Sequence, residues 1–191
     1  MALFGRRRRV PDRYRPPLER DERVLAWAEA ADGGALVATN RGLWLPDGGG
    51  AAGQGPSSPD SVAAPARLGW HEIHKAIWTG EKLEIIAARV ADHADGYDVV
   101  EDLPTVGFPL AEPGDLPGEV RARVTRSVGP STHHPLPGGG GARVAARRVP
   151  GVNGLRWTVR YDPGVDRDDP VIREATGQLV AQARAGVEVA P

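Results

Sequence analysis

The chain has 191 residues, of which 40% are hydrophobic and 26% are charged, and its formal net charge is −1. These values fit one globular domain, or one domain with an extension, and give no reason to expect a polyanionic partner. Because the chain has no cysteine, disulfide bonds, thiolate catalysis and zinc–thiolate sites are excluded. No apolar run approaches the roughly 20 residues that cross a bilayer, and Met1–Arg9 lacks the apolar segment of a secretory signal. We therefore expect a cytoplasmic location.

Residues 1–20 are rich in arginine and proline and predict an extended or disordered basic arm. Two interpretations of this arm stay open. Its arginines follow from a composition that favours arginine over lysine throughout the chain, or they hold the protein to an anionic membrane surface. In the second case the contacts come from the run Arg6, Arg7, Arg8 and Arg9, with each basic residue contributing about 1 kcal/mol near such a surface.

Strand-like patterns alternate with turn signals from residue 22 to residue 110. The predicted strands cover residues 22–30, 35–38, 42–45, 67–78, 82–90 and 97–110. Asp32-Gly33-Gly34 is a hairpin signal, and Pro104 interrupts the last strand. Residues 46–66 have no hydrophobic period and a composition of small and turn-forming residues, which predicts a long flexible loop.

The segment LVATNRGLWL at residues 36–45 is followed by RLGWHEIHKAIW at residues 67–78. This pattern of strands and tryptophans resembles the pleckstrin-homology-like (PH-like) domain of uncharacterised actinobacterial proteins, over roughly residues 20–128. The resemblance implies an antiparallel barrel whose open-end loops take protein segments and sometimes lipid head groups. Asp32-Gly33-Gly34 stands where inositol-phosphate binders carry clustered basic residues. A protein partner is therefore expected in preference to a phosphoinositide.

A helix is predicted over residues 113–128. Asp115 suits its N-terminal cap, and Leu116, Val120, Val124 and Val128 recur at four-residue spacing along one face. The PH-like resemblance implies that this helix caps the barrel. The expected fold class is mainly β (α+β): a PH-like antiparallel barrel with a capping helix, followed by a C-terminal β-hairpin and helix.

The C-terminal third begins with a predicted Gly/Pro linker at residues 131–141. Residues 142–149 and 155–161 then form a hairpin pattern, and Asp169-Pro170 is a helix start with a cap and a first-turn proline. The predicted domains are a basic arm (1–20), a PH-like domain (21–130), the linker (131–141) and a hairpin–helix unit (142–191). Whether the last unit packs on the barrel stays open.

Three groups of residues invite a chemical interpretation. His71-Glu72-Ile73-His74 is one residue short of the HExxH zinc motif, and the Asp-rich segment 162–169 lacks the spacing of a calcium loop. His133-His134 lies in the predicted linker. We therefore expect no catalytic residue, no metal ligand and no cofactor. A remote alternative is an enzyme that combines the 162–169 segment with His71 or His74.

The function expected from the sequence is a non-enzymatic, cytoplasmic binding or scaffold module that recognises a protein partner. The candidate partner-binding residues are Trp44, Trp70, Trp78, Arg121 and Arg123. The alternative is a peripheral membrane adaptor held by the arginine-rich arm. Residues 119–149 are basic, but aromatic residues are not interleaved with them and no RNA- or DNA-binding motif matches, so no nucleic acid is expected.

Overall fold

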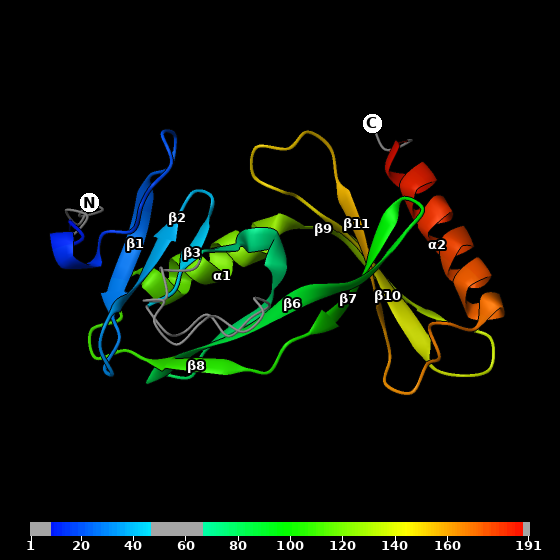
Figure 1. The fold of residues 1–191 in the computed structure, drawn as a ribbon, viewed down its shortest axis with the longest axis horizontal. Coiled ribbons are helices and arrows are strands. Elements are labelled where there is room, and N and C mark those ends of the chain that lie inside the picture. Colours follow the sequence, from blue (N-terminus) through cyan, green and yellow to red (C-terminus); the bar gives the residue numbers. More distant parts are fainter. Residues whose placement is uncertain (1–8, 47–66, 189–191) are drawn as a thin grey trace, which may run out of the picture. The chain divides into compact units, whose positions relative to one another are not determined.

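The computed structural model describes residues 9–46 and 67–188, which form two compact units (Figure 1). Unit 1 contains the described residues up to 87 together with residues 103–125, and unit 2 contains residues 88–102 and 126–188. The fold is mainly β with two α-helices, as the sequence predicts. The units cut across the predicted domain boundaries, because residues 88–102 leave the predicted PH-like domain and join unit 2.

Unit 1 is built from two antiparallel sheets. The first has the order β1 (Val24–Glu29), β2 (Ala35–Thr39), β3 (Gly42–Trp44) and β4 (Arg67–Gly69). The second places the first half of β6 (Lys82–Ala94) between β5 (Ile73–Trp78) and β8 (Val106–Pro109). The short 3-10 helix η2 (Trp70–Glu72) joins β4 to β5, and a bridge pairs Ala30 with Leu110 beyond β1 and β8. The two sheets thus curl around one core.

Helix α1 (Leu116–Ser127) closes that core. Leu116, Val120 and Val124 are buried in one cluster with residues of both sheets, such as Leu43 and Ile85. The predicted capping helix is therefore confirmed, with its apolar stripe facing the barrel. The helix ends one residue earlier than the sequence predicts, at Ser127, because Val128 already begins the next strand.

Unit 2 is a five-stranded sheet with helix α2 (Pro170–Glu188) on one face. Its strand order is the second half of β6, then β7 (Tyr97–Asp102), β11 (Arg156–Tyr161), β10 (Gly141–Arg147) and β9 (Val128–Pro135). Alternate residues of β11, Trp157 and Val159, pack against Ile172 and Val180 of α2. The hairpin and the C-terminal helix are confirmed, including the cap, since the Val171 N–H donates to the Asp169 Oδ1 at 2.8 Å.

The predicted linker at residues 131–141 is wrong over its first half. Residues 131–135 belong to β9, and only 136–140 form a loop before β10. Among the strands of the described residues, β9 pairs with β10 alone, and it is mostly exposed. An edge strand with two exposed faces needs no apolar alternation, so its sequence reads as a linker although its backbone is paired.

The predicted arm is also wrong for residues 10–18. Val10 is buried, and Tyr14 and Leu18 pack with it against Val37 and Trp44 on the outer face of the first sheet. These three apolar residues recur every fourth position, a signal that the surrounding arginines and prolines obscured. Residues 1–8 of the arm and residues 47–66 of the predicted loop lie outside the described residues. Among the described residues, no helix is both long and apolar enough to cross a bilayer.

Candidate functional site

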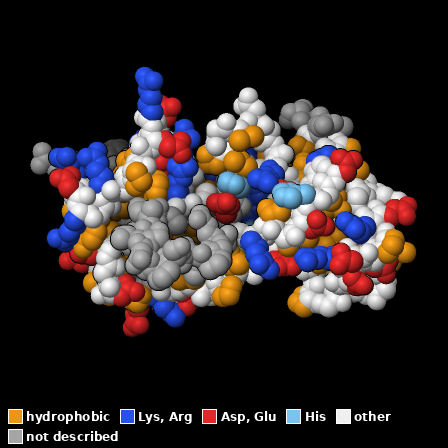
Figure 2. Space-filling view, viewed as in Figure 1, with side chains coloured by type: hydrophobic (Ala, Val, Ile, Leu, Met, Phe, Trp, Pro, Cys, Tyr) orange, Lys and Arg blue, Asp and Glu red, His pale blue; other side chains and the backbone are white. Residues whose placement is uncertain are grey.

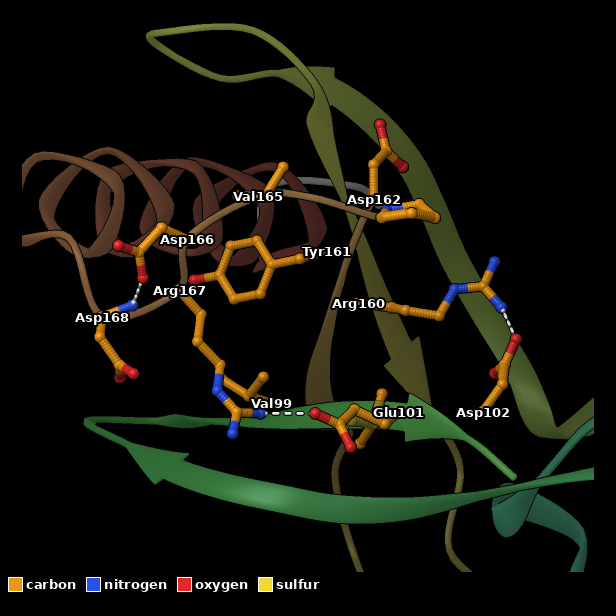
Figure 3. A pocket seen from close by; sticks show the side chains of 12 residues that line it. Val99, Glu101, Asp102, Arg160, Tyr161, Asp162, Val165, Asp166, Arg167 and Asp168 are labelled. Atoms are coloured by element: carbon orange, nitrogen blue, oxygen red, sulfur yellow. Dashed lines mark hydrogen bonds and ion pairs between the residues drawn. The ribbon is translucent and has the colours of Figure 1, made fainter. Parts of the chain in front are cut away.

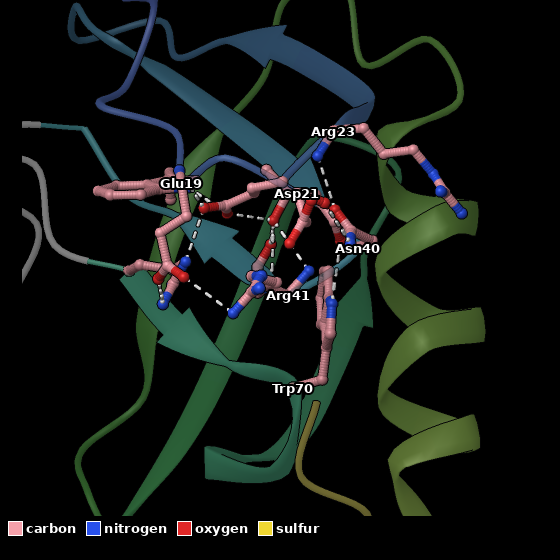
Figure 4. A network of polar contacts seen from close by, with 11 residues as sticks. Glu19, Asp21, Arg23, Asn40, Arg41 and Trp70 are labelled. Atoms are coloured by element: carbon pink, nitrogen blue, oxygen red, sulfur yellow. Dashed lines mark hydrogen bonds and ion pairs between the residues drawn. The ribbon is translucent and has the colours of Figure 1, made fainter. Parts of the chain in front are cut away.

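The LVATNRGLWL motif folds around a buried carboxylate, Glu22. Figure 4 shows the polar network of this region, in which Glu19, Asn40 and Arg41 are labelled. Three side chains donate hydrogen bonds to it: the Thr39 hydroxyl at 2.6 Å, the Trp44 indole N–H at 2.9 Å and the Arg67 guanidinium at 2.7 Å. The Trp70 indole N–H donates to the Thr39 carbonyl at 3.0 Å. Thr39 and Trp44 of the motif are thus hydrogen-bonded within the protein.

Hydrogen bonding decides the charge of Glu22. Burial alone would raise the pKa of this carboxyl, but the hydrogen bonds from Thr39 and Trp44 and the positive charge of Arg67 lower it below its ordinary value of 4.5. The carboxylate is therefore ionised in the folded protein at neutral pH. Its own side chain is fully buried, whereas Arg67 keeps 26% of its side chain exposed.

Glycine is required at position 42 because of packing and not because of a positive φ. A Cβ atom there would lie 2.3 Å from the Leu68 carbonyl oxygen of the neighbouring strand β4. The motif that dominates the sequence is thus explained by the fold of unit 1. The polar side chains of this motif form hydrogen bonds and ion pairs within unit 1, so few of their polar atoms are available to a partner.

The tryptophans and arginines proposed for partner binding are not gathered into one exposed surface. Trp44 and Trp70 are buried, and Trp78 is partly buried against the core of unit 1. Arg121 is exposed, whereas Arg123 is half-buried and donates to Glu119 one helical turn earlier at 2.7 Å. On the face in Figure 2, basic and acidic side chains are interspersed. Arg6, Arg7 and Arg8 lie outside the described residues, and Arg9 is exposed.

A cavity of about 660 Å³ lies within unit 2, beside the acidic segment that the sequence singled out (Figure 3). Its walls come from the end of β7, the end of β11 and the loop that leads to α2. The lining residues are Val99, Val100, Glu101, Asp102, Arg160, Tyr161, Asp162, Pro163, Val165, Asp166, Arg167 and Asp168. This volume is within the range of small-molecule and side-chain sites.

The cavity exists because two strands stop pairing before they end. Strands β7 and β11 form the parallel pair of the unit 2 sheet, and their pairing covers Thr158 with Asp98 and Val159 with Val99. Both strands continue, and within the described part of the chain the ladder partners of residues 100–101 and 160–161 lie in β6 and β10, on their outer sides. Their facing edges therefore open onto the cavity. Ligands commonly bind beyond the carboxyl ends of parallel strands.

Two ion pairs span the opening. Arg160 of β11 donates to Asp102 of β7 at 2.5 Å, and Arg167 of the loop donates to Glu101 of β7 at 2.6 Å. Glu101 also accepts a hydrogen bond from Arg89 of β6 at 3.0 Å. The hydrogen bond from Arg89, supported by the charge of Arg167, lowers the pKa of Glu101. Both arginines in the cavity wall are therefore already matched by carboxylates.

The remaining carboxylates are in the loop. Asp162 lies 2.9 Å from the Nε2 of His133 on β9, and Asp166 accepts the backbone N–H of Asp168 at 3.0 Å. Sequence reasoning assigned His133 to a linker and so missed this pairing. No signal in the sequence joins β9 to residue 162, because the contact depends on the sheet order. His71 and His74, the histidines considered for an enzyme site, belong to unit 1.

Residues 9–46 and 67–188 contain no group of three or more His, Asp or Glu side chains arranged to hold a metal ion. The site is therefore described by its cavity, its open strand edges and its charge. Comparison with known proteins gives no match for this chain among protein-family models, curated proteins or solved structures.

Proposed function

We propose that this chain is a non-enzymatic, cytoplasmic binding module that takes an extended segment of a partner protein into the cavity between β7 and β11. The observation that carries the proposal is the early end of the parallel pairing: two residue pairs are formed, and both strands then run on around a cavity of about 660 Å³. A strand gap of this kind offers backbone donors and acceptors to an incoming extended chain.

The cavity wall suits a peptide. Val99, Tyr161 and Val165 supply apolar surface for side chains. The facing edges of residues 100–101 and 160–161 supply the main-chain hydrogen bonds that give strand addition its affinity. The two ion pairs, Arg160 with Asp102 and Arg167 with Glu101, are partly exposed and form part of the cavity wall.

In this proposal unit 1 is the scaffold. Its four-stranded and three-stranded sheets and its capping helix enclose one apolar core. The side chains of its most distinctive sequence motif form internal hydrogen bonds. This favours placing the partner-binding site in unit 2.

The proposal is tested by selecting phage-displayed random 12-residue peptides on the full chain and measuring their affinity for two variants. Val165→Trp places an indole in the cavity wall, and we expect it to abolish binding of the selected peptides. Val152→Trp is the matched control, because Val152 is 63% exposed in unit 2 and does not line this cavity. It should leave binding unchanged.

Peptides that bind both variants equally, or a selection that yields no binder, would contradict the proposal. Far-ultraviolet circular dichroism of both variants separates loss of the site from loss of the fold.

A further inference from the structure

We infer that the segment bound in this cavity is basic, with a lysine or arginine side chain lying against Asp166 and Asp168. This inference rests on the proposed function and adds the chemistry of the partner. It follows from the charges that the cavity leaves unmatched.

The lining contains five carboxylates and two guanidinium groups. Each guanidinium is already paired, Arg160 with Asp102 and Arg167 with Glu101. Arg89, which lies outside the lining, supplies a second positive charge to Glu101. No cationic group of the cavity wall is therefore available for an acidic ligand.

The loop carboxylates are in the opposite situation. Asp166 and Asp168 are exposed and form no ion pair with any residue of the described ranges. Within the described ranges, the Asp162 carboxylate has one ion-pair partner, the imidazole of His133. The two negative charges of Asp166 and Asp168 thus lie on one side of an open cavity, and no cation of the described residues is paired with them.

Charge complementarity then selects among extended segments. A basic side chain that enters along the strand edges reaches the loop that begins where β11 ends. An acidic segment would meet like charges there and would have to displace Asp102 or Glu101 from its arginine. A free polyamine satisfies the carboxylates but leaves the strand edges open, so a peptide uses more of the site.

The test uses three fluorescein-labelled peptides of equal length, TKVTKVTKVT, TSVTSVTSVT and TEVTEVTEVT, with the full chain in fluorescence anisotropy. We expect affinity to fall in that order. Two exposed charge pairs correspond to about 2- to 30-fold in affinity, so the double variant Asp166→Asn, Asp168→Asn should weaken binding of the lysine peptide by that factor and leave the serine peptide unchanged.

The matched control removes the same charge elsewhere in unit 2. Asp95 and Glu174 are exposed and do not line the cavity, so Asp95→Asn with Glu174→Gln should leave the preference for the lysine peptide intact. Equal loss in both double variants would mean that overall charge, and not this site, attracts the peptide, and the inference would be overturned.

The outcomes separate the inference from the proposed function. Binding of the serine peptide that is lost in Val165→Trp, without preference for lysine, would leave the proposed function standing and overturn the basic partner. No binding of any peptide would contradict both. Displacement of the lysine peptide by spermidine at similar concentration would overturn the inference in favour of a small polyamine.

Discussion

The Glu22 cluster of unit 1 and the cavity of unit 2 both contain carboxylates, but these carboxylates have different surroundings. Glu22 has a fully buried side chain that receives hydrogen bonds from three side chains. Asp166 and Asp168 are exposed beside a cavity and have no cationic partner within the described residues. A carboxylate with all its partners inside the chain stabilises a fold, whereas one without them beside an open cavity is available to a ligand.

The sequence makes the first cluster conspicuous and the second obscure. The Glu22 partners Thr39, Trp44 and Arg67 lie in or next to strands with strong apolar patterns. The cavity residues lie at strand ends and in a turn-rich loop, where patterns are weak. In this chain the strong apolar patterns therefore indicate residues that the fold requires, whereas the candidate site lies in segments with weak patterns.

Removing Glu22 should have the largest effect. Glu22→Ala removes the carboxylate that accepts hydrogen bonds from the buried Trp44 indole and Thr39 hydroxyl and leaves Arg67 paired with Glu19 alone among the described residues, so we expect about 3–5 kcal/mol of destabilisation. Urea unfolding measures it. Glu81→Ala, an exposed glutamate of unit 1, is the control and should change the stability by less than about 0.5 kcal/mol.

Gly42→Ala should cause the next largest loss of stability. The added Cβ would meet the Leu68 carbonyl oxygen at 2.3 Å, and forced overpacking of this kind costs about 1–3 kcal/mol. Gly118→Ala in α1 has open space around it and should stabilise by up to about 1 kcal/mol. Equal effects at both positions would show that packing does not decide the choice of glycine at position 42.

The pH dependence of stability sharpens the comparison. Because the pKa of Glu22 is lowered in the folded protein, its contribution is fully present above its unfolded value of 4.5 and is lost as pH falls through the folded pKa. As the pH falls from about 5 to about 3, it passes through the usual range for a glutamate pKa. Over this range the free energy of unfolding of the wild-type protein should fall by more than that of Glu22→Gln. Parallel pH profiles for the two proteins would contradict the assignment.

The ion pairs of the cavity should contribute least to the stability of the protein. Arg167→Met removes a partly exposed pair with Glu101, and such pairs are worth about 0–1 kcal/mol. Thermal unfolding of this variant should therefore stay close to that of the wild type. A loss comparable to that of Glu22→Ala would mean that the cavity is held closed by its ion pairs, and the contrast between the two clusters would fail.

Local patterns were enough to predict most elements of the fold. The hairpin turn at residues 32–34, the helix stripe of Leu116, Val120 and Val124, and the Asp169 cap each depend on residues close in sequence, and the structure confirms them. Strand β9 was missed because an exposed edge strand leaves little periodic signal. The packing of residues 10–18 was missed because arginines and prolines surround its three apolar residues.

The candidate site could be predicted only in part. The sequence singled out the acidic segment 162–169, but the cavity also needs β7, whose residues 97–102 are far from β11 in the chain. Their parallel pairing and its early end are properties of sheet order, which no local pattern encodes. The same holds for the contact of His133 with Asp162.

The measurement that tests this account most directly is amide hydrogen exchange of the full chain with and without a peptide selected on it. The account predicts slower exchange at residues 100–101 and 160–161, where the strand edges open onto the cavity, and no change at residues 39–44 of the Glu22 cluster. Protection confined to residues 39–44, or absent from both strand ends, would contradict it.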